Sequence, residues 1–313
     1  MLRWLVARIL SKVAPWLASG TRAHRRDPAL HRYKPAQGSV RVLGDADTAE
    51  LWALVNRNPV ANIFVASHLE NTKTAAPTPA GGQILGYDAG GSLASACWAG
   101  ANIVPVETSP EAAQEFGRYL VATGKSFSSI FGPSDAVMEL WSELQTNAPS
   151  PFDVRPNQPL MELRTGPAIE PHPNLRFSIM EDFDALLPAC VAMFEEEVGY
   201  SPLVGGDQFY KQRIASFINR RHSMVDFDGG GEVVFKAELG SVSSQVTQIQ
   251  GVWMNPAYRG RGLSAAYLAA VVLLAREHAP VTSLYVNDYN TPAMASYRKV
   301  GFERVGTFAT ILL

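Results

Sequence analysis

The segment NPAYRGRGLSAAYLAAVVLLARE, residues 255–277, places a turn of alternating arginine and glycine directly before a sequence with helical spacing. The N-terminus of a helix presents backbone N–H groups without intrahelical partners, together with the positive end of the helix dipole. Glycine lets that backbone approach a ligand closely, and the side chains of Arg259 and Arg261 add positive charge. The segment therefore predicts an anion site suited to a pyrophosphate, with a solvated tight turn as the alternative.

Motifs that the sequence lacks narrow the class of ligand. The chain contains neither GxxxxGKS/T nor GxGxxG, which argues against a nucleoside triphosphate held by a Walker loop and against a nicotinamide cofactor. Its two cysteines, Cys97 and Cys190, lack metal-ligand spacing and its histidines are scattered, so we predict no metal site and a reducing, cytoplasmic location. The net charge of -2 gives no sign of a nucleic-acid partner, and none is expected.

The first 38 residues are predicted to form a basic amphipathic extension. Residues 1–34 contain eight Lys or Arg and one acid. Within residues 1–17 the apolar side chains share one helical face, and Arg8 and Lys12 lie on the other. These two charges make the segment unlike a secretory signal or a membrane span. The favoured interpretation is a helix packed on the protein's own body or an extension without fixed structure, and peripheral contact of residues 1–17 with an anionic membrane is the alternative.

The body of the chain divides into two parts with a similar order of predicted elements. Five prolines in residues 155–174 predict a linker around one short strand. On both sides, hydrophobic periodicity and turn residues predict strands and helices in the order β-β-β-α-β-α. This order indicates a duplicated unit of the α/β class with a mixed (α+β) sheet. The predicted parts are the extension 1–38, a first domain 39–165 and a second domain 172–313.

A second motif, NDYNTPAMASYRKVGF at residues 287–302, follows the quoted segment. Together the two segments resemble the GNAT superfamily of N-acyltransferases, whose pattern is V-x-x-x-P-x-x-R-G-x-G followed by N-x-x-A-x-x-x-Y-x-x-x-G-F. One departure is Ser264, which stands where the family usually has glycine or alanine and whose small hydroxyl still fits. The matching residues are Val252, Pro256, Arg259, Gly260, Gly262, Asn290, Ala293, Tyr297, Gly301 and Phe302.

The whole chain resembles an actinobacterial group in which an uncharacterised domain precedes the acetyltransferase domain, judged from the runs FKAELG, QIQGVWMNPAYRGRGLS and SLYVNDYNTPA. The resemblance implies two tandem GNAT-like domains, each a mostly antiparallel mixed sheet flanked by helices. In the first domain, Glu107, Pro110 and Glu111 stand where the anion loop would be, and two acids there repel a pyrophosphate. We therefore expect a degenerate domain without cofactor that shapes the acceptor cleft or mediates assembly, for example as a homodimer.

The resemblance also implies acetyl-CoA as the cofactor. Residues 252–254 would pair with the pantetheine arm as an added strand, residues 259–264 would hold the pyrophosphate, and Asn290 would bond the pantetheine region. Tyr297 stands where the superfamily often has the acid that protonates the leaving thiolate, and a phenol with its ordinary pKa of about 10 suits that task. The alternative for Tyr297 is a helix tyrosine that packs under Phe302. The predicted cofactor-binding residues are Val252, Trp253, Met254, Arg259, Gly260, Arg261, Gly262, Leu263, Ser264 and Asn290.

The acceptor is expected to be a small-molecule amine or a protein amino group that attacks the thioester directly. Glu238 is the candidate general base, with the glutamates Glu195, Glu196 and Glu197 or water as alternatives. Three acids at a helix C-terminus oppose the helix dipole, which is compatible with a role in binding a cation, but a solvated acidic helix end is the favoured interpretation. Glu197 is expected to contact a cationic acceptor, because it lies nearest the loop that would cover the site.

Two functions remain open from the sequence. The first is an N-acetyltransferase that works in a ternary complex with Tyr297 as general acid. The second is a sensor that binds acetyl-CoA without turnover. Intact Asn290 and Tyr297 favour the enzyme, because a sensor needs only the pyrophosphate loop.

Overall fold

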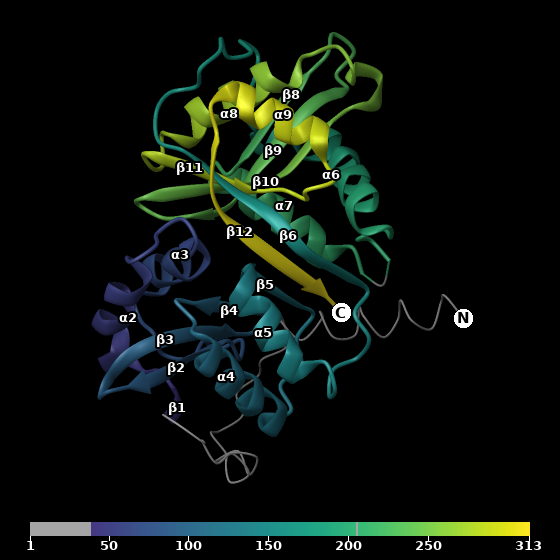
Figure 1. Cartoon of the computed structure of the whole chain (residues 1–313). Helices are drawn as coiled ribbons and strands as arrows, with labels where there is room; N and C mark the ends of the chain where they lie inside the picture. The colour runs from purple at the N-terminus through teal and green to yellow at the C-terminus, as the bar shows by residue number, and fades with distance from the viewer. Residues whose placement is uncertain (1–38, 205) are drawn as a thin grey trace. The chain divides into compact units, whose positions relative to one another are not determined.

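The computed structural model describes residues 39–204 and 206–313 (Figure 1). The predicted basic extension, residues 1–38, lies outside the described residues, and so does its membrane-facing segment. The described residues form two compact units, one that ends at Leu160 and also includes Gly306–Leu313, and one of Met161–Val305. None of the helices described is both long and apolar enough to cross a membrane.

The first unit is a mixed sheet with helices on both faces (Figure 1). In spatial order its strands are β1 (Ser39–Val42), β2 (Gln83–Ala89), β3 (Ser92–Ala99), β4 (Asn102–Val106), β5 (Ser129–Pro133), β12 (Glu303–Leu312) and β6 (Asp153–Leu163). Its helices are α2 (Thr48–Val55), α3 (Ile63–Thr72), α4 (Pro110–Thr123) and α5 (Ser134–Leu144). The pairs from β1 to β4 are antiparallel, and so is β5 with β12. The parallel pair β4–β5 is joined through α4.

The two faces of this sheet carry separate hydrophobic cores. Cys97 and Ala99 of β3 pack in the core built with α4 and α5. Ala96 and Trp98 pack in the core built with α2 and α3. Successive side chains of a strand point to opposite faces, so a fully apolar strand needs helices on both sides.

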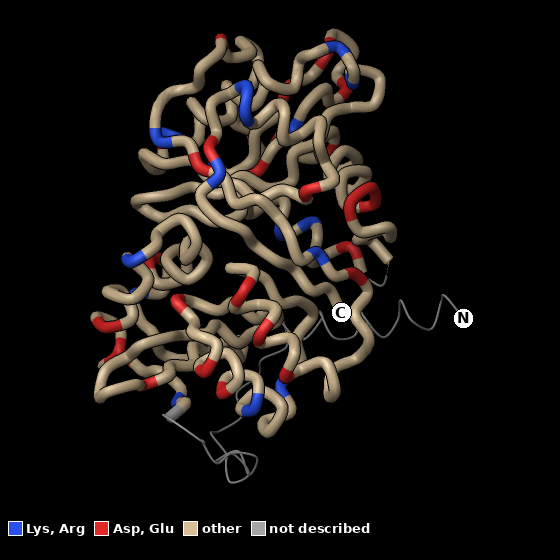
Figure 2. Tube along the Cα trace, viewed as in Figure 1, with Lys and Arg blue, Asp and Glu red and all other residues tan. Residues whose placement is uncertain are grey.

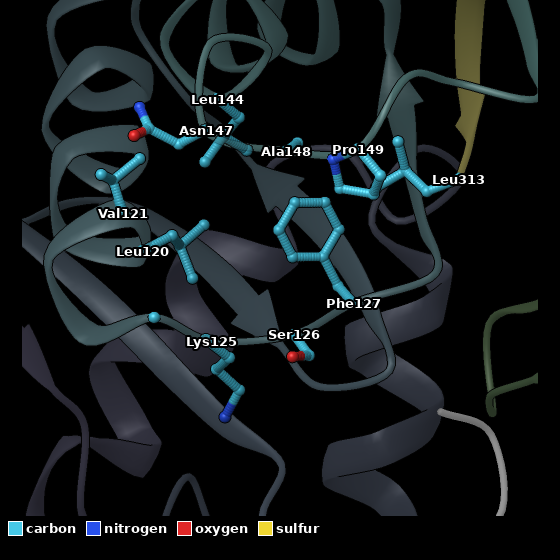
Figure 3. A pocket seen from close by; sticks show the side chains of 11 residues that line it. Leu120, Val121, Lys125, Ser126, Phe127, Leu144, Asn147, Ala148, Pro149 and Leu313 are labelled. Atoms are coloured by element: carbon cyan, nitrogen blue, oxygen red, sulfur yellow. The ribbon is translucent and has the colours of Figure 1, made fainter. Parts of the chain in front are cut away.

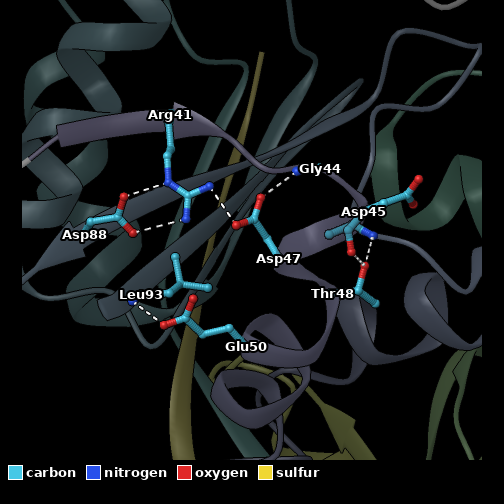
Figure 4. Close-up of polar contacts among 9 residues, drawn as sticks. Arg41, Gly44, Asp45, Asp47, Thr48, Glu50, Asp88 and Leu93 are labelled. Carbon is cyan, nitrogen blue, oxygen red and sulfur yellow. Dashed lines mark hydrogen bonds and ion pairs between the residues drawn. The ribbon is translucent and has the colours of Figure 1, made fainter. Parts of the chain in front are cut away.

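Polar contacts fix the edge strand β1 (Figure 4). Arg41 donates from Nε to Asp88 Oδ2 of β2 at 2.6 Å and from Nη1 to Asp47 Oδ1 at 2.8 Å. Asp47 closes the short helix η3 (Asp45–Asp47) and accepts a hydrogen bond from the Gly44 backbone N–H. Its pKa is lowered, because these hydrogen bonds and the charge of Arg41 outweigh the effect of burial. One guanidinium thus joins β1, β2 and the start of the first helical layer.

The second unit has the same kind of architecture. Its strands lie in the order β11 (Val281–Tyr285), β10 (Val246–Met254), β9 (Val233–Val242), β8 (Ser223–Phe227) and β7 (Arg176–Phe177). Its helices are α6 (Phe183–Val198), α7 (Gln208–Asn219), α8 (Ser264–Ala275) and α9 (Thr291–Val300). The pairs from β7 to β10 are antiparallel, and β10 pairs with β11 in parallel through the crossover helix α8. Both units therefore have the mostly antiparallel, helix-flanked mixed sheet that the sequence predicted.

Burial along β9 also follows the two faces of its sheet. Phe235, Ala237 and Leu239 pack in the core that contains α8 and α9. Lys236 and Glu238 alternate with them, and Cys190 of α6 contacts Glu238. The two charged residues therefore point to the face that α6 covers, where they are buried.

The structure differs from the sequence prediction in the linker and at the C-terminus. The strand predicted within the linker at 155–174 is present, but it is longer than expected, because β6 runs from Asp153 to Leu163. Proline fixes φ at a value that an extended strand accepts, so Pro156 and Pro159 lie within β6, although neither has a backbone N–H to donate. The compact units also divide the chain elsewhere than the predicted 39–165 and 172–313. The last residues group with the first unit, because residues 308–312 pair with β5.

A β-bulge interrupts β10 next to the candidate site. Gln250 pairs with Glu238 and Trp253 pairs with Lys236, so two residues of β10 oppose one residue of β9. Gly251, the first of these two, has a φ of 57°. The parallel ladder with β11 ends at Gln248, although β10 continues to Met254. A bulge bends and twists a strand, which gives the end of β10 a course of its own.

We expect Gly251→Ala to lower the free energy of unfolding by about 1–3 kcal/mol, the cost of a strained backbone position. A Cβ there would adopt the left-handed region and would lie 3.0 Å from Glu238 Oε2 and 3.4 Å from Lys236 Nζ. Urea denaturation measures the effect. Gly229→Ala is the matched control, because no heavy atom lies within 4 Å of its added Cβ. Equal midpoints for the two variants would show that the bulge does not need glycine.

Candidate active site

The quoted segment forms an exposed turn at the start of α8. Asn255 caps the short helix η5 (Pro256–Tyr258) by accepting a hydrogen bond from the Ala257 N–H at 3.0 Å. Gly260 and Gly262 follow, each with a φ of 73°, and a Cβ on either would meet nothing within 4 Å. Among the described residues, no side chain caps the N-terminus of α8 at Leu263. The first N–H groups of α8 therefore lack side-chain partners and lie beside two glycines.

The two arginines of the turn have different surroundings. Arg259 donates from Nε to the Met254 carbonyl at 2.8 Å and from Nη2 to both carboxylate oxygens of Glu196, at 2.8 and 2.9 Å. Arg261 lies over the ring of Tyr258, with 5.1 Å between Cζ and the ring centroid. It is exposed and forms no ion pair with any residue that the structure describes. Arg261 is thus the more available cation of the pair.

The other predicted cofactor-binding residues lie on β10 and at the starts of α8 and α9. Val252 packs against the core that contains α8 and α9, whereas Trp253 is buried on the α6 side. Ser264 Oγ lies 3.8 Å from Met254 Sδ. Asn290 caps α9, because its side-chain oxygen accepts from the Ala293 N–H at 3.2 Å. The Asn290 amide nitrogen remains as a donor for a ligand.

Tyr297 lies on α9 and is buried, with 7% of its surface exposed. Its ring meets Phe302 edge-on at 5.9 Å, so the packing contact predicted as the alternative is present. Burial, and then the negative charge of Glu197, raise the pKa of Tyr297 to about 12. The phenol therefore keeps its proton throughout the neutral range. A residue of this kind can donate a proton as well as fill the core.

Glu238 lies in a buried ion pair that the sequence analysis did not foresee. Lys236 Nζ contacts Glu238 Oε1 at 2.5 Å, and Lys236 is fully buried. Cys190 Sγ and Gln250 Nε2 complete the surroundings, at 3.8 and 3.4 Å from the carboxylate. Burial by itself would raise the pKa of Glu238, but the charge and hydrogen bond of Lys236, the charge of Arg213 and the hydrogen bond from Gln250 together outweigh it, and the pKa is lowered. A carboxylate of low proton affinity is a weak base, which argues against the predicted catalytic role of Glu238.

Breaking this pair is expected to destabilise the second unit. Lys236→Met leaves the carboxylate of Glu238 buried without its counter-ion and should lower the free energy of unfolding by about 3–5 kcal/mol. The double variant Lys236→Met/Glu238→Leu removes both charges and should recover most of the loss. Denaturant unfolding of the wild type and the two variants tests this. A double variant no more stable than the single one would contradict a coupled pair.

The three glutamates Glu195, Glu196 and Glu197 form a continuous acidic run at the end of α6 (Figure 2). All three are exposed, and Gly199 ends the helix with a φ of 82°. Glu196 accepts hydrogen bonds from Arg259 and, at 3.1 Å, from Trp253 Nε1. Glu197 acts electrostatically on Tyr297. The structure thus links the acidic run to both motifs of the second unit.

The corresponding crossover of the first unit has no open helix start. Ser109 caps α4 by accepting a hydrogen bond from the Ala112 N–H at 3.2 Å. The pKa of Glu111 is lowered because its carboxylate accepts hydrogen bonds at the helix start, from its own backbone N–H and from Ser109. Between β4 and β5, the ring of Pro105 lies 3.3 Å from where a Cβ of Gly132 would be. The start of α4 therefore has a side-chain cap and an acid, unlike the start of α8.

A pocket opens in the first unit at the end of α4 and α5 (Figure 3). Leu120, Phe127 and Leu144 form its apolar wall. None of the predicted site residues lines it, so it gives no support to the predicted active site.

The comparisons with known proteins give two family matches, which overlap between residues 160 and 186. Residues 160–302 match the model of the acetyltransferase (GNAT) family. They form a GNAT acetyltransferase domain. Residues 82–186 match a domain of unknown function (DUF4081), which fits the uncharacterised N-terminal domain expected from the sequence. No curated protein matches the chain.

Solved structures extend the likeness to both units. An acetyltransferase of the GNAT family from Colwellia psychrerythraea is 12% identical, with a TM-score of 0.53 over 88% of this chain and 99% of that one. A GCN5-related N-acetyltransferase from Sphaerobacter thermophilus is 14% identical, with a TM-score of 0.56 over 89% and 96%. A tandem GNAT protein from the clavulanic acid biosynthesis pathway is 12% identical, with a TM-score of 0.50 over 87% and 98%. These likenesses show the fold and confirm the predicted tandem GNAT architecture.

Proposed function

We propose that the protein is an N-acetyltransferase that uses acetyl-CoA and acts on an amine through its GNAT domain. The observation that carries this proposal is that the second unit has both a helix start without a side-chain cap and a strand end outside its ladder, which we call the two open features. The N-terminus of α8 has no side-chain cap among the described residues. The end of β10, after Gln248, lies beyond the parallel ladder with β11. The first unit has the same crossover with a capped helix start.

The open features suit the two ends of the cofactor. The backbone N–H groups of residues 260–264 and the side chain of Arg261 would hold the pyrophosphate, since a helix N-terminus favours an anion. The backbone of residues 252–254 would pair with the pantetheine arm as an added strand, and the Asn290 amide would donate to it. Acetyl-CoA would supply an activated acyl group, whose transfer forms a C–N bond and breaks the C–S bond.

The residues of the chain would manage the protons of this transfer. Tyr297 would donate its phenolic proton to the leaving thiolate, a step that its raised pKa permits at neutral pH. The proton that the amine loses would go to water, because Lys236 keeps Glu238 a weak base. Water can then return a proton to Tyr297, so that the balance closes.

Glu197 is proposed to attract a cationic acceptor. It is exposed at the end of α6, and its charge acts on Tyr297, so it lies near the proposed acid. Glu195 and Glu196 add negative charge at the same helix end. An amine is a cation before it loses its proton, and an exposed acidic run attracts it electrostatically.

Release of free thiol from acetyl-CoA in the presence of pooled amines tests the function, and Tyr297→Phe tests the mechanism. The variant keeps the ring and removes the proton, so we expect turnover to fall by about ten- to ten-thousand-fold. Affinity for CoA, measured by calorimetry, should stay the same. CoA binding without turnover by the wild type would favour the alternative, a sensor of acetyl-CoA. Wild-type turnover by the variant would show that another group protonates the thiolate.

Glu197→Gln should raise the Michaelis constant of a cationic acceptor and leave that of acetyl-CoA unchanged. Loss of a hydrogen bond to a charged group costs roughly 1.5–3 kcal/mol, which corresponds to about a ten- to hundredfold weaker acceptor. Glu195→Gln is the control, since it removes the same charge from the same helix end. Equal effects of both variants would show a general field instead of a direct contact.

A further inference from the structure

An ion pair joins the cofactor turn to the end of α6. Arg259 contacts both carboxylate oxygens of Glu196, a residue 63 positions earlier in the chain. Its Nε donates to the Met254 carbonyl, and Trp253, the residue before Met254, donates from Nε1 to Glu196. The Arg259 guanidinium also lies 6.0 Å from the Trp253 ring. Four residues from α6, β10 and the turn thus form one connected group.

Within this group, the carboxylate of Glu196 is the ion-pair partner of Arg259, the first arginine of the motif. One nitrogen of the Arg259 guanidinium, Nη2, donates to both Glu196 oxygens, and phosphate oxygens can accept from the same nitrogen. Glu196 therefore satisfies Arg259 in the way that an anionic ligand would. Arg261, two residues further on, has no such partner among the described residues.

We propose that Glu196 is an internal competitor for Arg259, so that a phosphate of CoA displaces it and thereby frees the end of α6. This inference rests on the proposed function, because it assumes that CoA binds at this turn. Before CoA binds, Glu196 neutralises Arg259. Afterwards the phosphate takes that role, and the ion pair of Glu196 no longer holds the end of α6 to the turn.

The exposure of the pair makes such an exchange feasible. The side chains of Arg259 and Glu196 are 45% and 47% exposed, so water stabilises either ion when the other leaves. The buried pair of Lys236 and Glu238 provides the contrast, because neither partner of that pair can reach water. A phosphate carries more negative charge and more acceptor oxygens than a carboxylate, which favours the exchange.

The exchange also couples the cofactor turn to the acceptor side. Glu196 precedes Glu197, and its contact with Arg259 holds the last turn of α6 against the motif. Release of that contact changes the freedom of the segment that begins at Gly199. Because coupling of binding equilibria is reciprocal, whatever loosens α6 from Arg259 should strengthen CoA binding, and CoA should loosen α6.

The test is the affinity of the full chain for CoA in the wild type, in Glu196→Gln and in Glu195→Gln, measured by calorimetry. Glu196→Gln removes the competitor and should bind CoA about two- to fivefold more tightly, as expected for loss of one exposed ion pair. Glu195→Gln removes an equal charge from the same helix end and leaves the contact with Arg259 in place. Its smaller effect on CoA affinity therefore measures the general electrostatic contribution of one negative charge. Equal or weaker CoA binding by Glu196→Gln, relative to Glu195→Gln, would overturn the proposal.

Salt dependence gives a second readout that a purely structural contact would not change. In the wild type, CoA binding exchanges one ion pair for another, whereas in Glu196→Gln it forms one pair more than it breaks. The logarithm of the association constant should therefore fall more steeply with salt in Glu196→Gln than in the wild type. Identical slopes would overturn the exchange. If the wild type itself does not bind CoA, the proposed function fails; if it binds and the variants are alike, only this inference fails.

Discussion

The bulge of β10 at Gly251 is the constraint on which the site depends. It sits directly beside the buried pair of Lys236 and Glu238, and its positive φ admits glycine with least strain. The bulge turns the last residues of β10 onto a course separate from β11, so the strand carries backbone groups that a ligand can pair with. The turn and the start of α8 follow directly. The position of the proposed cofactor site is therefore set by one irregularity in an otherwise regular sheet.

The two units share one arrangement of strands and a crossover helix but differ at the N-terminus of that helix. Each has a parallel strand pair joined by a crossover helix, which brings a helix N-terminus to the end of a strand. In the first unit Ser109 and Glu111 satisfy the N-terminus of α4, and Pro105 fills the space between the strands. In the second, glycines leave the start of α8 open. A few side chains at equivalent places thus separate a capped helix start from an open one, which is the difference on which the proposed cofactor site rests.

The second unit contains one buried ion pair and one exposed ion pair, and they differ in chemical consequence. The pair of Lys236 and Glu238 is shielded from water, so each ion depends on the other and neither is free for proton transfer. The pair of Arg259 and Glu196 is exposed, so it is weak and exchangeable. The pKa of Tyr297 is raised by burial and then by the charge of Glu197, so the phenol keeps its proton. The same residue types have different chemistry because their access to water differs.

The sequence by itself determined the local features: the glycine turn before α8, the second motif around Asn290 and Tyr297, and the alternation that makes the strands. These follow from backbone preferences and periodicity, which act over neighbouring residues. Only the tertiary structure decided that Lys236 neutralises Glu238, that Glu196 occupies Arg259, and that the last residues of β12 complete the first unit. The i and i+2 spacing of Lys236 and Glu238 on an otherwise apolar strand was a signal for the first of these. The others join residues far apart in the chain, and folding, not local pattern, sets their distance.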